Sequence, residues 1–246
     1  IDLSKRFSTG QWLKAAIKKI KEIKKRKKIP ILVGGTGLYF QSLINGLVKI
    51  PKIPLKFRNK VRLLQKKEGQ KRFYKKLLKL DPMTKNRFDK NYVQRTIRAF
   101  EIKSYTKISM YKWLKETKPK FQEEDFLKLY IDIKREDLIK KISERSIKMI
   151  QEGAIKEVKK FKKFKIKKDL SVNRVIGIDE LTQYLDEKIN LDQAIELIAI
   201  KTRQYAKRQA TWARSRMTSW KKINPIKIAD YIKKLNKSSL KLDQLT

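Results

Sequence analysis

The segment that most constrains the fold of this 246-residue chain reads ILVGGTGLYFQSLINGL and occupies residues 31–47. Its first three residues are apolar and mostly β-branched, as in a buried parallel strand, and after Gly34–Gly37 the apolar spacing becomes helical. Glycines between a strand and a helix let backbone amides and the Thr36 hydroxyl approach a ligand. The segment therefore predicts an α/β fold with a site at the end of the strand, where open parallel sheets bind ligands. A tight turn without a ligand is the alternative.

The residues around this segment predict further elements of the same domain. Ser8 and Gln11 have the spacing of a capping box, so we expect a helix that begins there and ends in the basic run 24–28. A parallel strand at 31–33 needs neighbours, which must come from later residues or from sequence before Ile1. We therefore expect residues 1–50 to belong to an α/β core.

The remainder of the chain predicts a helical domain and a return to the core. Residues 55–120 have helical periodicity and no convincing strand, so 51–121 is interpreted as a helical insertion domain. Alternating apolar residues at 127–133 predict a strand that rejoins the core sheet. Within the third segment, 122–246, we expect a helix that ends near Gly153, a long helix over 192–220, and a loosely packed tail from Ile223.

The composition excludes several kinds of chemistry. The chain has no cysteine and no histidine, which rules out disulfides, thiol nucleophiles, imidazole bases and His/Cys zinc sites. Nothing approaches the ~20 apolar residues of a membrane span, and the N-terminus lacks a signal-peptide pattern. We therefore expect a cytoplasmic protein with no membrane partner.

The charge points to a polyanionic partner. A formal net charge of +40 favours association with nucleic acid, because Lys and Arg neutralise phosphates. The excess of lysine and isoleucine can also arise from AT-rich codon usage, so a run such as 24–28 can equally be a solvated face. Arginine is the better indicator, since it is preferred where a planar two-pronged donor is needed.

Five separated blocks occur in one order and together resemble a known enzyme family. They comprise GGTGLYFQSLINGL (34–47), Gln94–Glu101, Arg145 in a helix leading to Gly153 and Glu157-Val158, Arg174–Gly177, and Thr202–Gln209 with Thr211-Trp212. The chain resembles the bacterial tRNA dimethylallyltransferases from Ser8 to about Trp220. The resemblance implies a P-loop, nucleotide-kinase-like parallel-sheet core with an all-helical insertion. It also implies transfer of a dimethylallyl group from dimethylallyl diphosphate to the N6 amine of the adenosine beside the anticodon.

The resemblance implies a site for the diphosphate. Thr36 and Arg145 would contact it, and Gly34, Gly35 and Gly37 would form the turn around it. A hydroxyl and a guanidinium suit this task because charge builds on the departing oxygens. The alternatives are that Thr36 caps the following helix and that Arg145 forms a surface ion pair with Glu144, Glu152 or a neighbouring helix.

The resemblance also implies contacts with the tRNA anticodon stem-loop. The implied residues are Arg58, Gln94, Arg95, Thr96, Ile97, Arg98, Arg174, Val175, Ile176, Gly177, Ile178 and Asp179. Ile178 stands where the family pattern leads us to expect an aromatic residue, which argues against stacking there. Arg95 and Arg98 lie near one helix face and can hold phosphates or stack on bases, or can simply be solvated. On the long helix we assign Tyr205 and Trp212 to packing and the neighbouring cations to RNA.

Two parts of the family pattern are missing. No G-x-x-x-x-G-K-[ST] motif occurs in the chain, and by resemblance the P-loop and a general-base Asp would precede Ile1. We therefore expect Mg²⁺ to be bound mainly by that segment, and this chain alone to be an inactive monomer. The alternatives are a non-catalytic tRNA-binding remnant and a prenyltransferase that acts on free adenine nucleotides.

Overall fold

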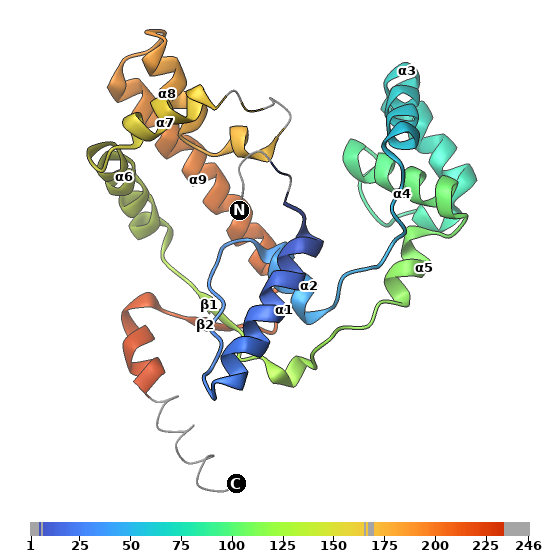
Figure 1. Cartoon of the computed structure of the whole chain (residues 1–246), viewed down its shortest axis with the longest axis horizontal. Coiled ribbons are helices and arrows are strands. Elements are labelled where there is room, and N and C mark those ends of the chain that lie inside the picture. The colour runs from blue at the N-terminus through green and yellow to red at the C-terminus, as the bar shows by residue number, and fades with distance from the viewer. Residues whose placement is uncertain (1–4, 6, 165, 167–169, 234–246) are drawn as a thin grey trace, which may run out of the picture. The chain divides into compact units, whose positions relative to one another are not determined.

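The computed structural model describes residues 5, 7–164, 166 and 170–233, and these form two compact units. The first unit comprises Ile1–Phe40 and Glu124–Thr246, and the second comprises Gln41–Glu123. The predicted insertion domain, 51–121, lies within the second unit. Figure 1 shows the elements of both units along the chain.

The first unit contains most of the helices and the small sheet. Its elements are α1 (Thr9–Lys25), η2 (Glu123–Asp125, which begins one residue before the boundary), β1 (Leu129–Ile131), α6 (Arg135–Gln151), α7 (Ala154–Lys163), η3 (Ser171–Arg174), α8 (Ile178–Leu185), α9 (Leu191–Arg216), β2 (Lys221–Ile223) and η4 (Pro225–Lys227). The boundary between the units falls within α2 (Gly37–Ile44).

Helix α1 begins and ends as predicted. The Ser8 side chain accepts a hydrogen bond from the backbone N–H of Gln11, and the Gln11 side chain accepts one from the backbone N–H of Ser8. This reciprocal box satisfies two amides that the first helical turn leaves unpaired. Ile17 and Ile20 are buried on one face, and the helix ends within the basic run.

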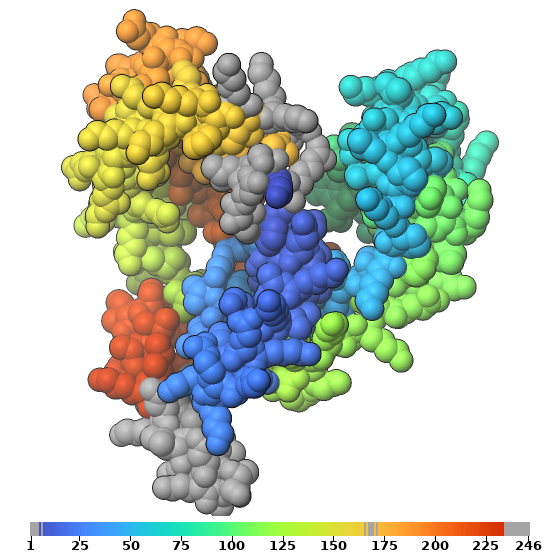
Figure 2. Space-filling model, viewed as in Figure 1, coloured from blue at the N-terminus to red at the C-terminus, as the bar shows by residue number. Residues whose placement is uncertain are grey.

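The prediction of a strand at 31–33 is wrong. These residues have no regular structure, and Ile31 and Val33 are 81% and 91% exposed. A strand exists only through hydrogen bonds to a neighbour, and no described segment pairs with this one. In Figure 2 the blue chain that follows α1 lies uncovered on the viewed face.

The sheet of the described residues has two short parallel strands. β1 lies within the strand predicted over 127–133, and it pairs with β2 in the register Leu129↔Lys221 to Ile131↔Ile223. The prediction of a strand here is thus confirmed for Leu129–Ile131. The prediction of a loose tail is wrong at its first residue, because Ile223 is paired and buried. Residues 234–246 of that tail lie outside the described part.

Helices α6 to α9 pack around an apolar cluster. Its buried members are Ala154, Val158, Leu181, Ala194 and Ile198. Gly153 has a left-handed φ of 103° and separates α6 from α7, as predicted. The long helix α9 contacts both α6 and α8 and so connects the helices of this cluster.

The second unit is built from helices, as predicted. It contains α3 (Leu55–Leu80), η1 (Pro82–Thr84), α4 (Val93–Thr106) and α5 (Met110–Lys115). A kink at Gly69, where φ is 71°, divides α3. Its two halves and α4 share a core in which Val61, Phe73 and Ile97 are buried. The ring centroids of Phe73 and Phe100 lie 4.8 Å apart.

Candidate functional site

The glycine turn places Thr36 immediately before α2. The Thr36 carbonyl accepts a hydrogen bond of 3.0 Å from the Tyr39 N–H, which closes the first turn of the helix. Thr36 is exposed, so its hydroxyl is open to a ligand in solvent. The free backbone amides at the start of a helix favour anions at this position.

Helix α9 packs directly on this turn, and its side chains leave no room for a Cβ atom at two of the glycines. Gln209 Nε2 donates a hydrogen bond of 3.2 Å to the Gly35 carbonyl. A Cβ atom at Gly35 would collide with the Gln209 amide, and one at Gly37 would collide with the Trp212 indole. The assignment of Trp212 to packing is therefore confirmed. Gln209 was not predicted as a partner of the turn, although its three-residue spacing from Trp212 places both on one helix face.

An open hollow of about 510 Å³ lies beside the turn, between residues of α1 and the start of α2. Trp12 and Tyr39 line it and stack with ring centroids 4.6 Å apart. Thr36 and Lys19 also line it, and Lys19 Nζ lies 2.6 Å from Glu22. An aromatic wall with a hydroxyl and an ammonium beside it suits a ligand that has an apolar part and an anionic end.

Arg145 lies exposed on α6. Among the described residues it forms no hydrogen bond or ion pair, and Glu152 pairs with Lys148 instead, at 3.6 Å. The alternative of a surface ion pair for Arg145 is therefore not realised within that part of the chain. Among the described residues, no hydrogen bond joins the side chains of Arg145 and Thr36.

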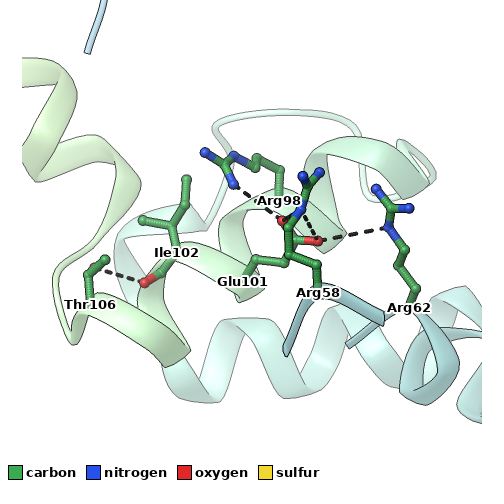
Figure 3. A network of polar contacts seen from close by, with 6 residues as sticks. All are labelled: Arg58, Arg62, Arg98, Glu101, Ile102 and Thr106. Atoms are coloured by element: carbon green, nitrogen blue, oxygen red, sulfur yellow. Dashed lines mark hydrogen bonds and ion pairs between the residues drawn. The ribbon is translucent and has the colours of Figure 1, made fainter. Parts of the chain in front are cut away.

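In the second unit, predicted tRNA residues converge on a carboxylate that sequence reasoning had not selected. Glu101 of α4 is 1% exposed, and its Oε2 lies 3.3 Å from both Arg58 Nε and Arg98 Nη1. Arg62 Nε lies 4.0 Å from Oε1 of the same carboxylate. Figure 3 shows the three guanidiniums around this one side chain. Helical spacing could have indicated part of this cluster. Arg62 follows Arg58 by four residues, and Glu101 follows Arg98 by three, so the members of each pair lie on one face of their helix.

The other predicted residues of α4 divide between surface and core. Gln94 and Arg95 are exposed, and the Arg95 guanidinium lies 5.2 Å from the ring centroid of Tyr92. Thr96 and Ile97 are buried, and Thr96 Oγ1 accepts a hydrogen bond of 3.0 Å from Gln70 Nε2. Their side chains therefore support α4 from inside and do not form part of its surface.

The segment Arg174–Asp179 forms η3, a turn and the start of α8. Arg174, Val175 and Asp179 are exposed, whereas Ile176 and Ile178 pack against the core of the α6–α9 cluster. Gly177 has a φ of 105°.

Glu180 fixes this turn, although sequence reasoning had not selected it. It is 1% exposed, and its Oε2 accepts a hydrogen bond of 2.7 Å from the Gly177 N–H. Lys201 of α9 forms ion pairs with Glu180 and Asp179. The hydrogen bond to Glu180 is the main reason why the pKa of Lys201 lies above its ordinary value.

The exposed face of α9 carries a second hollow, of about 420 Å³, whose lining includes Lys207, Arg208 and Trp212. Tyr205 is 42% exposed, and the Arg208 guanidinium lies 5.6 Å from its ring centroid. The assignment of Tyr205 to packing is therefore wrong. This face offers cations and aromatic rings together, a combination suited to nucleic-acid backbones and bases.

The described residues contain no group of three or more acidic side chains placed to hold a metal ion. None of the described helices is long and apolar enough to cross a membrane.

Three comparisons with known proteins bear on these sites. The family model described as IPP transferase matches residues 1–216. A protein of Pelagibacter ubique named tRNA dimethylallyltransferase is 73% identical over 246 residues, which are all of this chain and 79% of that protein. A protein of the same name from Rickettsia massiliae is 40% identical over 88% of this chain and 60% of its own length.

Solved structures show the same similarity. The tRNA isopentenylpyrophosphate transferase of Bacillus halodurans superposes with a TM-score of 0.60 at 28% identity, covering 99% of this chain and 78% of that one. A eukaryotic dimethylallyltransferase acting on tRNA superposes with a TM-score of 0.72 at 29% identity, over 87% of this chain and 54% of that one. The P-loop type of fold implied by the resemblance is thus the fold of the solved relatives.

Proposed function

Since the chain belongs to the IPP transferase family, we propose that it modifies tRNA by transferring a dimethylallyl group from dimethylallyl diphosphate to an adenosine amine. The acceptor is the N6 amine of the adenosine 3′-adjacent to the anticodon. The observation that carries this proposal is the match of the entire chain to a relative named for this reaction. That match includes the glycine turn and the arginine-bearing helix α4.

The hollow beside the glycine turn supports a role in binding the prenyl donor. Its aromatic wall of Trp12 and Tyr39 can accept the five-carbon chain, and the exposed Thr36 hydroxyl can donate to the diphosphate. Donors fixed at the departing oxygens stabilise the transition state as negative charge develops there. We assign this role to Thr36 and to Arg145, with Gly34, Gly35 and Gly37 shaping the turn.

The solvent-accessible arginines of the second unit support a role in binding tRNA. The Arg95 side chain is exposed and those of Arg58 and Arg98 are partly exposed, so their guanidiniums can contact phosphates or stack on unpaired bases. An acceptor as small as a free nucleotide needs no such surface. The adenosine must also leave its stack before its amine can meet the prenyl donor.

Mg²⁺ has no fitting set of acidic ligands among the described residues. We place the protein in the cytoplasm, where its tRNA substrate occurs, and propose that it acts as a monomer. Sedimentation of the chain with and without tRNA tests the second point, because a monomer binds one tRNA without self-association.

Mass spectrometry of tRNA nucleosides tests the proposed reaction. The 246 residues would replace the matching residues of the Pelagibacter ubique relative, and both this chimera and the chain itself would be incubated with tRNA and dimethylallyl diphosphate. We expect prenylated adenosine from the chimera. A folded chimera that binds tRNA and makes no such product would favour the binding remnant over the enzyme.

A further inference from the structure

The carboxylate of Glu101 lies at the centre of three arginines in the second unit (Figure 3). It is 1% exposed, whereas the side chains of Arg58, Arg62 and Arg98 are 34%, 44% and 41% exposed. Burying a carboxylate is costly unless cations and hydrogen bonds compensate for lost water. The arrangement therefore joins a buried anion to three cations that remain accessible from outside.

The donor atoms used inside the cluster leave others free for a ligand. Arg58 and Arg62 face Glu101 through Nε, and Arg98 faces it through Nη1. Each guanidinium carries five N–H donors, so each retains several beyond those directed at Glu101. In Figure 3 the terminal nitrogens of Arg58 and Arg62 point away from the carboxylate.

The charge balance of the cluster indicates the chemistry of its ligand. Three guanidiniums face one carboxylate, so two positive charges remain uncompensated by this group. Phosphodiesters carry one negative charge each and accept paired hydrogen bonds from guanidiniums. The excess charge matches two adjacent backbone phosphates.

We propose that Glu101 is a positioning residue, which holds Arg58, Arg62 and Arg98 as a preformed cradle for the tRNA backbone. Arg62, which the sequence did not indicate, supplies a third cation of this cradle. The inference rests on the proposed function in tRNA modification. Ion pairs to a buried partner restrict long arginine side chains before RNA arrives, which reduces the entropy lost on binding.

The variant Glu101→Gln separates positioning from simple charge. It adds one unit of positive charge, so a purely electrostatic surface would bind RNA more tightly and with a steeper salt dependence. Loss of positioning has the opposite effect, and we expect about tenfold weaker binding of an anticodon stem-loop RNA. The logarithmic salt slope should become shallower by about one phosphate contact. Equal or tighter binding by the folded variant would overturn the proposal.

Glu68→Gln is the matched control. Glu68 belongs to the same unit, is 19% exposed, and pairs with Lys76 outside the cluster. The substitution makes the same change of charge, and we expect no loss of RNA affinity. Circular dichroism and the thermal midpoint report whether each variant is folded. A loss of stability in Glu101→Gln with unchanged RNA binding would show that Glu101 serves only the fold.

Arg62→Ala tests the cradle without replacing a buried side chain, because the Arg62 side chain is 44% exposed. Arg72→Ala removes an exposed cation of the same helix and serves as its control. We expect Arg62→Ala to lower affinity for the stem-loop severalfold more than Arg72→Ala, and equal effects would contradict the cradle. Titration with inorganic pyrophosphate distinguishes a diphosphate site, because pyrophosphate binding that depends on Arg62 would overturn the assignment to RNA. If the unaltered chain does not bind the stem-loop, the proposed function itself fails.

Discussion

Single residues determine how closely two distant segments approach at the glycine turn. Gly35 and Gly37 touch the side chains of Gln209 and Trp212, whereas a Cβ at Gly34 would meet only Phe40 Cζ, at 3.9 Å. The three glycines therefore differ in what they tolerate, although the sequence presents them as one motif. The close contact is a packing constraint in addition to any role in binding the donor.

We predict that Gly37→Ala destabilises the chain and that Gly34→Ala does not. The added methyl at position 37 displaces a half-buried indole, and such overpacking typically costs about 1–3 kcal/mol. Gly35→Ala should be intermediate, because the end of the Gln209 side chain can rotate away. Chemical denaturation of the three variants measures the order, and equal stability at positions 34 and 37 would contradict the close packing.

We predict that Thr36→Ala and Arg145→Ala slow prenyl transfer and leave tRNA affinity nearly unchanged. Losing one fixed donor to a leaving group typically costs about 3 kcal/mol of transition-state stabilisation. Single-turnover transfer by the chimera, measured beside tRNA binding, tests this. Thr36→Ser keeps the hydroxyl and should retain most of the rate. Normal transfer by either alanine variant would remove that residue from the site.

At the scale of elements, the junction of α8 and α9 depends on a buried carboxylate. Glu180 holds the left-handed turn at Gly177 and is paired by Lys201 from α9. Removing one partner of a buried pair leaves its charge uncompensated. The junction is therefore sensitive to the protonation state of a single lysine.

We predict that Lys201→Gln lowers the free energy of unfolding by about 2 kcal/mol near neutral pH. Lys207→Gln, an exposed change on the same helix, is the control and should have little effect. The pKa of Lys201 is raised by Glu180 and Asp179, so its contribution is complete below the ordinary value of 10.5 and disappears as the pH rises through the folded-state pKa. The difference in free energy of unfolding between the unaltered chain and Lys201→Gln should therefore shrink above about pH 10, and a constant difference would contradict this pairing.

Elements that depend on local signals were predictable, and those that depend on distant partners were not. The start of α1 follows from Ser8 and Gln11, and the end of α6 from Gly153, because each signal lies within one helical turn. The segment 31–33 has the composition of a strand but no described partner. β2 was missed because Lys221-Lys222-Ile223 is too short to show alternation.

The same distinction applies to the candidate site. Arg58 and Arg98 could be selected from a family pattern, but their convergence on Glu101 depends on how α3 and α4 pack. A buried glutamate has the same appearance in a sequence as a solvated one. Gln209 was likewise inside a matched block, yet only the fold shows that it holds Gly35.

At the scale of the whole molecule, the charge is far larger than one site requires. The formal net charge of +40 attracts polyanions without regard to their sequence, whereas the arginines of α4 lie at defined positions. Affinity and specificity can therefore reside in different residues. The many lysines provide long-range electrostatic attraction, and the arginines at particular positions make direct contacts with the RNA.

We predict that Arg95→Ala with Arg98→Ala weakens tRNA binding and lowers its logarithmic salt slope by about one to two phosphate contacts. Joint replacement of Lys24, Lys25 and Lys27 by alanine should do much less, although it removes more charge. Filter binding across a salt series compares the two sets. Similar losses of affinity from both sets would mean that RNA is bound by the overall positive charge, and that α4 makes no contacts with particular phosphates.

The parallel pairing of β1 with β2 has a consequence for the order of folding. Leu129 and Lys221 meet only after the chain between them, which contains α6 to α9, has turned back on itself. Closing such a long loop costs chain entropy that three residue pairs repay poorly, whereas the helices in between form mostly local contacts. The helical cluster should therefore assemble first and bring the strand ends together. The sheet should therefore form after the helical cluster. During refolding, we expect the backbone amides of β1 and β2 to acquire protection from hydrogen exchange later than those of α9.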